Sequence, residues 1–159
     1  PGEEPLVRFL GDALEGVPLP LPWTLYRSAD RKMFFVDATT GTSSWAHPFL
    51  EALRDLARTF RACAELPADR RRDFVESLID AWDADAKREV SLWVPVKTDG
   101  SQECYYYRSD TRQTTWLRPT DMILPAVFLK EQAARRLLDG AYVADLLVAA
   151  EGGRRPSGS

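Results

Sequence analysis

One aromatic pattern occurs twice in this chain, and the repetition limits the folds that the chain can adopt. Each copy has a tryptophan, then an adjacent pair of aromatic residues, then a second tryptophan that is followed three residues later by a proline. From the aromatic pair onward the two copies align without a gap. The first copy consists of Trp23, Phe34, Phe35, Trp45 and Pro48, and the second of Trp93, Tyr105, Tyr106, Trp116 and Pro119.

Each copy predicts a three-stranded antiparallel meander. Stretches rich in aromatic, Thr and Val residues are separated by turn residues, such as Thr40 and Gly41 in the first copy and Asp99 and Gly100 in the second. Neighbouring side chains in a strand point to opposite faces of the sheet. One member of each aromatic pair therefore packs inward with the first tryptophan and the proline, while the other faces outward beside the second tryptophan.

Helical patterns surround both sheets. Apolar residues at helical spacing predict a helix directly after Pro48, a second helix over about 67–88, a third from about Leu124 to Asp139 and a short final helix around Tyr142 and Leu146. A leading helix is predicted because the segment from Leu6 to Ala13 parallels the one that precedes the second sheet. The repeated unit is therefore helix, sheet, helix.

These patterns predict an α+β fold in which the two sheets and their flanking helices pack as one compact body. We expect a first unit over residues 3–66 with its sheet at 19–48, a second over residues 67–151 with its sheet at 90–119, and a flexible tail over 152–159. Hairpins of this size are not stable alone, so the helices must support them. A hydrophobic content of 45% is sufficient for such a core.

The order of a tryptophan, an aromatic pair and Trp-x-x-Pro resembles the WW domain over residues 19–48 and 90–119. In that family the first tryptophan, the second aromatic residue and the proline form a structural buckle. The resemblance implies this role for Trp23, Phe35, Pro48, Trp93, Tyr106 and Pro119. The family's peptide groove lies between the first aromatic residue and the second tryptophan, beside a Ser or Thr hydroxyl. The implied groove residues are Phe34, Ser43 and Trp45 in the first copy and Tyr105, Thr114 and Trp116 in the second.

The resemblance to WW domains implies a proline-rich ligand. Two parallel aromatic walls accept a pyrrolidine ring, and a polyproline II segment is ordered before it binds. We therefore expect a non-catalytic scaffold or adaptor module, part of a larger protein, that binds a proline-rich segment of another protein. In the alternative interpretation, the chain's own helices cover both grooves and the domain assembles through helical surfaces. That arrangement would make Trp45 and Trp116 inaccessible.

Some positions depart from the WW pattern. Phe34 and Ala38 stand where the family usually has Tyr and His, so we do not expect a Leu-Pro-x-Tyr preference. Arg108 replaces the Asn or Asp that braces the sheet in the family, a position that Asp37 occupies in the first copy. Ser28, Arg31 and Lys32 could bind a phosphate, as loops of some WW domains do, but we expect a solvated turn.

The extended unit also resembles the N-terminal WW region of centriolar distal-appendage coiled-coil proteins. The likeness rests on the leading helix, on the helix after the first sheet, and on the run Ser44, Trp45, Ala46, His47 and Pro48. In those proteins the module recruits a kinase through a proline-containing segment. The resemblance implies a kinase partner and a location at the centriole, basal body or cilium.

Composition and motifs argue against other classes of protein. A net charge of -3 provides no field that would attract nucleic acid. Cys63 and Cys104 lie far apart, which favours a reducing cytoplasm and indicates neither a zinc site nor a disulfide. His47 has no catalytic partner at motif spacing, and no glycine-rich phosphate loop is present, so we expect no enzyme activity and no cofactor. No apolar run approaches the roughly 20 residues that span a bilayer, so we expect no membrane partner. We also expect the chain to be a monomer.

Overall fold

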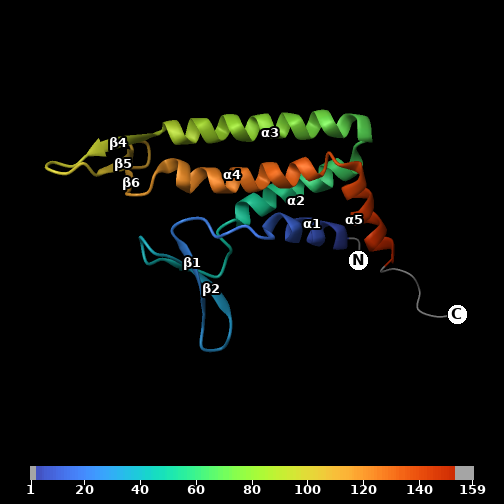
Figure 1. The fold of residues 1–159 in the computed structure, drawn as a ribbon, viewed down its shortest axis with the longest axis horizontal. Helices are drawn as coiled ribbons and strands as arrows, with labels where there is room; N and C mark the ends of the chain where they lie inside the picture. The colour runs from blue at the N-terminus through green and yellow to red at the C-terminus, as the bar shows by residue number, and fades with distance from the viewer. Residues whose placement is uncertain (1–2, 153–159) are drawn as a thin grey trace. The chain divides into compact units, whose positions relative to one another are not determined.

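A computed structural model describes residues 3–152 and confirms the predicted α+β class. The described chain forms five helices and two three-stranded antiparallel sheets (Figure 1). In chain order the elements are α1 (Glu4–Leu14), β1 (Trp23–Arg27), β2 (Met33–Asp37), β3 (Ser43–Ser44), α2 (Leu50–Glu65), α3 (Ala68–Ser91), β4 (Trp93–Lys97), β5 (Cys104–Arg108), β6 (Gln113–Thr115), α4 (Pro119–Arg136) and α5 (Gly140–Gly152).

The two sheets are separate meanders with the same topology. The strand order is β1-β2-β3 in one sheet and β4-β5-β6 in the other. In the first sheet Tyr26 pairs with Phe34, and Phe35 pairs with Ser44. In the second sheet Val96 pairs with Tyr105, and Tyr106 pairs with Thr115. The register is therefore the same in both sheets, as the sequence repeat predicts.

The tight turns of the sheets depend on residues with positive φ. In the β1–β2 turn Arg31 has a φ of 67°, and in the β4–β5 turn Gly100 has a φ of 82°. Glycine adopts this conformation without steric cost, whereas a residue with a Cβ atom is strained there. Gly41, with a φ of 72°, donates its backbone N–H to the Asp37 carbonyl and closes the β2–β3 turn. The β2–β3 turn therefore uses the glycine that the sequence places there.

The predicted helices are present, and the helix after the second sheet differs from its expected bounds. The stripe that begins at Phe49 lies in and just before α2, where Leu56 and Cys63 are buried. The prediction that this later helix begins near Leu124 was wrong, because α4 begins at Pro119. Proline is favoured in the first helical turn, where its missing N–H has no partner to lose. The proline that closes the second aromatic pattern is thus also the start of a helix.

Packing groups the described residues into two units that differ from the contiguous repeats. One unit is helical and contains residues 3–17, 50–79 and 128–152, and the other contains residues 18–49 and 80–127 with both sheets. The predicted boundary between residues 66 and 67 was drawn from the sequence repeat, whereas these two units are grouped by packing. Of the predicted tail, only Gly152, the last residue of α5, is described.

The helical unit has a core built from segments that are distant in sequence. Its largest fully buried side chains include Phe9, Leu56, Val75 and Leu146, and Phe9 stacks on Phe60 with ring centroids 5.2 Å apart. Polar contacts join the same elements at their edges. These are Arg8 to Asp145 at 2.9 Å, Tyr142 to Asp12 at 2.6 Å, Arg61 to Glu3 at 3.0 Å and Lys130 to Asp55 at 3.1 Å.

None of the helices within residues 3–152 has both the length and the apolar character needed to cross a membrane.

Candidate functional site

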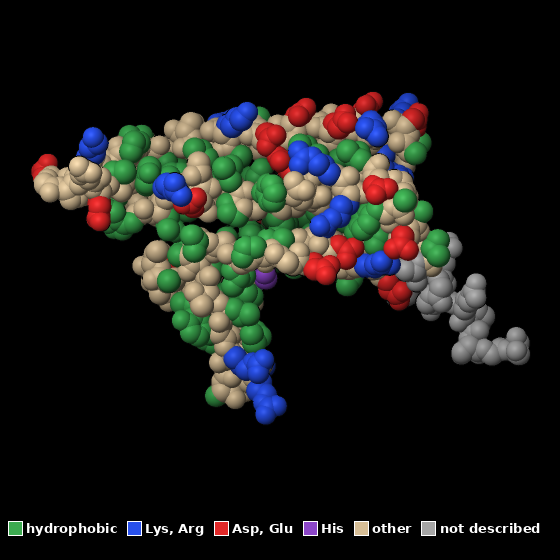
Figure 2. Space-filling view, viewed as in Figure 1, with side chains coloured by type: hydrophobic (Ala, Val, Ile, Leu, Met, Phe, Trp, Pro, Cys, Tyr) green, Lys and Arg blue, Asp and Glu red, His purple; other side chains and the backbone are tan. Residues whose placement is uncertain are grey.

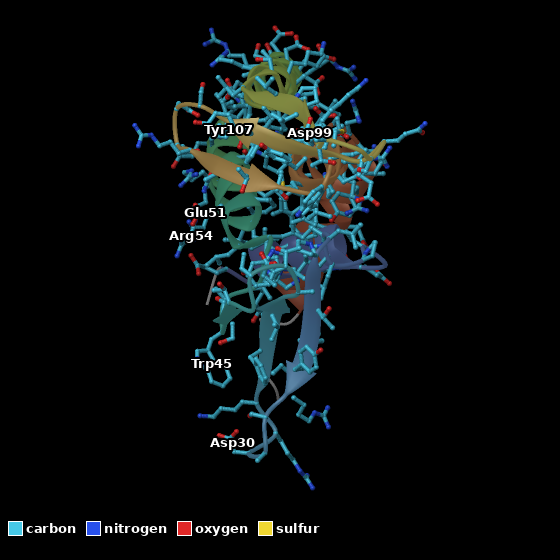
Figure 3. The ribbon with its side chains drawn as sticks, turned by 90° about the vertical axis from the view of Figure 1, so that its left-hand side faces the viewer. Asp30, Trp45, Glu51, Arg54, Asp99 and Tyr107 are labelled. Atoms are coloured by element: carbon cyan, nitrogen blue, oxygen red, sulfur yellow. The ribbon has the colours of Figure 1, made fainter. Side chains whose placement is uncertain are left out.

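The first candidate site is an aromatic corner on the first sheet. The rings of Phe34 and Trp45 have centroids 5.9 Å apart and planes inclined by 64°. Trp45 is 67% exposed, and its side chain projects from the sheet in Figure 3. The hollow beside these rings is lined by Ser28, Phe34, Ser43, Ser44 and Trp45. We call this hollow the first groove.

The second sheet carries an equivalent site with nearly the same geometry. Tyr105 and Trp116 have ring centroids 5.7 Å apart and planes inclined by 66°. Trp116 is 63% exposed. The second groove is lined by Tyr105, Thr114, Thr115 and Trp116. The predicted aromatic pairs are therefore brought together in both sheets, but as inclined rings that form a corner, not as the parallel walls that we expected.

Strand register explains why these rings meet. Phe35 pairs with Ser44, so the next residue of the chain, Trp45, lies beside Phe34 at the start of β2. The same relation between Tyr106 and Thr115 puts Trp116 beside Tyr105. Because β2 and β5 begin at their hairpins with β1 and β4, each groove lies at that hairpin end of its sheet.

Hydroxyl groups near each tryptophan have two different roles. Ser44 Oγ accepts a hydrogen bond from the Ala46 N–H at 3.0 Å, and Thr115 Oγ1 accepts one from the Leu117 N–H at 3.1 Å. These bonds fix the turn that carries each tryptophan. The predicted ligand-binding hydroxyls belong to Ser43 and Thr114, which line the grooves and are exposed.

Beside the first groove lies an aromatic residue that the sequence motif did not identify. Tyr26, on β1, stacks on Phe34 with ring centroids 5.9 Å apart and planes inclined by 25°. Tyr26 is 50% exposed, so its ring extends the aromatic surface across a third strand. The corresponding residue of the second sheet is Val96, which pairs with Tyr105. A cross-strand aromatic partner of Phe34 could have been found by aligning β1 against β2 in the sequence.

The predicted buckle residues are more buried than the groove tryptophans. Pro119 is buried, and the remaining members, Trp23, Phe35, Pro48, Trp93 and Tyr106, are partly buried. Trp23 pairs with Asp37, which makes Phe35 its diagonal neighbour on the same face of the sheet. The register thus places Trp23 and Phe35 on the face opposite to Phe34.

His47 connects the first sheet to the start of α2. Its ring contacts Phe35 at 5.1 Å between centroids and stacks on Phe49 at 5.7 Å. The Phe49 N–H donates a hydrogen bond to His47 Nδ1 at 3.0 Å. Burial lowers the pKa of His47, and protonation of Nδ1 would also remove this acceptor. The geometry gives His47 a packing role.

Asp37 in the first sheet and Arg108 in the second occupy equivalent positions, and each stabilises its sheet through different polar contacts. Asp37 accepts hydrogen bonds from Thr39 N, Thr39 Oγ1 and Thr40 N. Burial acts to raise the pKa of Asp37, but these hydrogen bonds outweigh it and the pKa is lowered. Arg108 instead binds Asp110 through two nitrogens, at 2.7 and 3.0 Å, and lies 3.8 Å from Glu89. The second sheet is thus braced by an ion pair.

The size of the grooves matches that of one or two side chains. The first groove has a volume of about 240 Å³ and the second about 310 Å³. These values lie at or below the lower end of the roughly 300–1,000 Å³ that is typical of sites for drug-sized ligands. An exposed aromatic corner of this size can pack against a small apolar ring and align it with a neighbouring hydroxyl.

No family model matches the chain, and a search of curated proteins finds no match either. The architecture defines a class: two separate three-stranded antiparallel sheets with flanking helices, an arrangement that is compatible with tandem WW-like domains.

Proposed function

We propose that this chain is a non-catalytic interaction module whose two grooves, as in WW domains, bind proline-rich segments of another protein. The observation that carries the proposal is the duplicated pair of exposed, inclined rings, Phe34 with Trp45 and Tyr105 with Trp116. A pyrrolidine ring is compact, apolar and conformationally restricted, so it can pack against such a corner at little entropic cost. The adjacent Ser43 and Thr114 hydroxyls can donate to a peptide carbonyl.

The exposure of the groove tryptophans favours this proposal over a purely structural scaffold. In the scaffold interpretation the helices cover both grooves, which requires buried tryptophans. Trp45 and Trp116 are 67% and 63% exposed, whereas tryptophan is highly buried on average. Large exposed aromatic side chains are also enriched at the centres of binding surfaces.

The proposal extends to the location and the partner. The helix α1 before the first sheet and the run from Ser44 to Pro48, which leads directly into α2, match the pattern of the centriolar distal-appendage proteins. We propose a scaffold or adaptor at the centriole or basal body whose partner is a kinase with a proline-containing segment. Imaging of the tagged protein in ciliated cells tests the location: a diffuse signal without centriolar enrichment would reject it.

The experiment for the binding function is a titration of a neutral proline-rich peptide, followed by nuclear magnetic resonance of the tryptophan indole N–H groups. We expect the signals of Trp45 and Trp116 to shift and those of Trp23 and Trp93 to move little. The double variant Trp45→Ala with Trp116→Ala should lose binding. A matched control is Phe128→Ala, because Phe128 is similarly exposed at 63% but lies on α4, outside both grooves. Undiminished binding by the double variant would refute the proposal.

A further inference from the structure

The hairpin turn beside each groove is held by the same hydrogen bonds. In the first sheet Ser28 donates its N–H and its hydroxyl to the Lys32 carbonyl, at 2.8 and 3.0 Å. In the second sheet Thr98 donates its N–H and its hydroxyl to the Glu103 carbonyl, at 3.3 and 3.0 Å. Lys32 and Glu103 are therefore structurally equivalent residues of opposite charge.

These two residues lie next to the groove aromatics. Lys32 precedes Phe34 by two residues, and Glu103 precedes Tyr105 by two residues. Side chains two residues apart along an extended chain point to the same face. Both side chains are exposed, and Ser28, the partner of Lys32, lines the first groove. The charge at this position therefore borders the surface on which a peptide would lie.

Each turn, counted as a whole, has the same sign of net charge as its equivalent residue. From Arg27 to Lys32 the β1–β2 hairpin contains three basic side chains, Arg27, Arg31 and Lys32, against one acidic side chain, Asp30. Asp30 already lies 3.9 Å from the Lys32 amine. The two arginines are exposed, and blue side chains gather at this hairpin end of the first sheet in Figure 2.

The β4–β5 hairpin has the opposite balance. From Lys97 to Glu103 it contains two acidic side chains, Asp99 and Glu103, against one basic side chain, Lys97. All three are exposed. The basic residue Arg112 lies in the β5–β6 turn, at the end of the sheet away from the groove, and Arg108 is paired with Asp110. The net charge of the turn beside the second groove is therefore negative.

We propose that the two grooves select proline-rich segments of opposite flanking charge: the first groove binds a segment with an acidic flank, and the second binds one with a basic flank. This inference rests on the proposed function, in which the grooves bind proline. A polyproline II chain advances by about 3.1 Å per residue, so a charged residue two positions from the bound proline is displaced by about 6 Å, less than the roughly 8 Å Debye length. Complementary charge then determines which segment each groove binds.

The test uses the full chain with one groove removed at a time and three peptides that share a proline-rich core. Trp116→Ala retains the first groove, and Trp45→Ala retains the second. The peptides carry flanks of glutamate, of glutamine or of lysine, and isothermal titration gives each Kd. We expect the first groove to bind the glutamate peptide about three- to tenfold more tightly than the lysine peptide, the combined effect of a few exposed ion pairs, and the second groove to show the reverse order. High salt should reduce both differences.

Charge reversal locates the effect in the turns. Lys32→Glu, made in the Trp116→Ala protein, should reduce or reverse the preference for the glutamate peptide, and Glu103→Lys, made in the Trp45→Ala protein, should do the same for the lysine peptide. Lys87→Glu on α3 is the matched control, because Lys87 is exposed and outside both sheets, and it should leave both preferences unchanged.

The outcomes separate the two proposals. If the glutamine peptide binds and the flanks make no difference, the charge selection is wrong and the proline-binding function stands. The same conclusion follows if both grooves prefer the same flank, or if the turn variants change nothing. If no peptide binds at all, including the glutamine peptide, the proposed function fails and the charge selection fails with it.

Discussion

Tyr26 stacks on Phe34 across the pairing of β1 with β2, and Phe34 in turn contacts Trp45. The first groove is therefore bordered by a row of three rings, one from β1, one from β2 and one that follows β3. The second groove has two rings, because its β4 residue is Val96. This difference makes the two grooves chemically unequal although their ring geometries agree.

A substitution at Tyr26 should weaken the first groove selectively. An aromatic pair contributes about 0.5–1.5 kcal/mol beyond its buried area, so Tyr26→Ala should reduce the affinity for a proline-rich peptide by about two- to tenfold. Isothermal titration in the Trp116→Ala protein measures this effect. Val96→Ala in the Trp45→Ala protein is the control, with a smaller expected change. Equal losses in the two proteins would argue against a role for the third ring.

Trp23 and Trp45 should have opposite effects when each is replaced by alanine. Trp23 is partly buried beside Phe35, so Trp23→Ala should lower the free energy of unfolding by up to about 3 kcal/mol, the lower end of the range for fully buried aromatics. Trp45 is 67% exposed, and Trp45→Ala should change stability by less than about 0.5 kcal/mol while removing binding at the first groove. Urea unfolding of both variants measures this. Similar destabilisation by both would assign Trp45 to the core.

The hydrogen bond from Tyr142 to Asp12 should contribute to the stability of the helical unit. It joins α5 to α1 at 2.6 Å, and burial and this bond both raise the pKa of Tyr142. We expect Tyr142→Phe to cost about 1–2 kcal/mol, since a bond to a charged group is stronger than a neutral one but this pair is only partly buried. Thermal unfolding at neutral pH measures the loss, with Tyr26→Phe as a control on an exposed tyrosine.

The same tyrosine should make stability fall in alkaline solution. Its pKa is raised in the folded state, so its contribution is complete below the unfolded pKa of about 10 and is lost as the pH increases above it. Tyr142→Phe should therefore lose less stability between pH 9 and pH 11 than the parent chain. Parallel pH profiles for the two proteins would contradict this assignment.

His47 should make stability fall in mild acid. Burial lowers the pKa of His47, so the unfolded chain binds its proton first. The contribution of neutral His47 is complete above the unfolded pKa of about 6.5 and is lost as the pH decreases through 6.5 toward the lower folded value. Urea unfolding at pH 7.5 and pH 5.5 should show a smaller loss for His47→Gln than for the parent chain. An identical loss would mean that carboxyl groups alone account for the acid sensitivity.

The strands and both ring pairs could be predicted because period-two alternation and an internal repeat act together. Phe34 and Phe35 must face opposite sides of a strand, and the second copy repeats the arrangement with Tyr105 and Tyr106. Tyr26 was missed because its contact depends on the register between β1 and β2, and the motif does not specify that register. The inclination of the rings was also missed, because side-chain torsions follow from local packing and not from spacing.

The start of α4 was predicted incorrectly for a different reason. Pro119 completes the aromatic pattern, and the helix was predicted from the apolar periodicity that follows it, which begins near Leu124. In the structure Pro119 begins the helix and Pro125 lies inside it. The later turns bury Leu129 and Ala133, and this burial offsets the lost backbone hydrogen bond.

The two hairpin turns differ in length by one residue. The β1–β2 turn is closed by the hydrogen bond from Ser28 to Lys32, and the β4–β5 turn, which is one residue longer, by the hydrogen bond from Thr98 to Glu103. The ring centroids beside these turns are nevertheless almost equally far apart, at 5.7 Å for Tyr105 and Trp116 and 5.9 Å for Phe34 and Trp45. An insertion in this hairpin is thus absorbed locally and does not disturb the aromatic corner. Mutations can therefore change the length or the charge of the hairpin turn without changing the geometry of the aromatic corner. After a gene duplication, two copies of one ancestral unit could diverge in this way to recognise different partners.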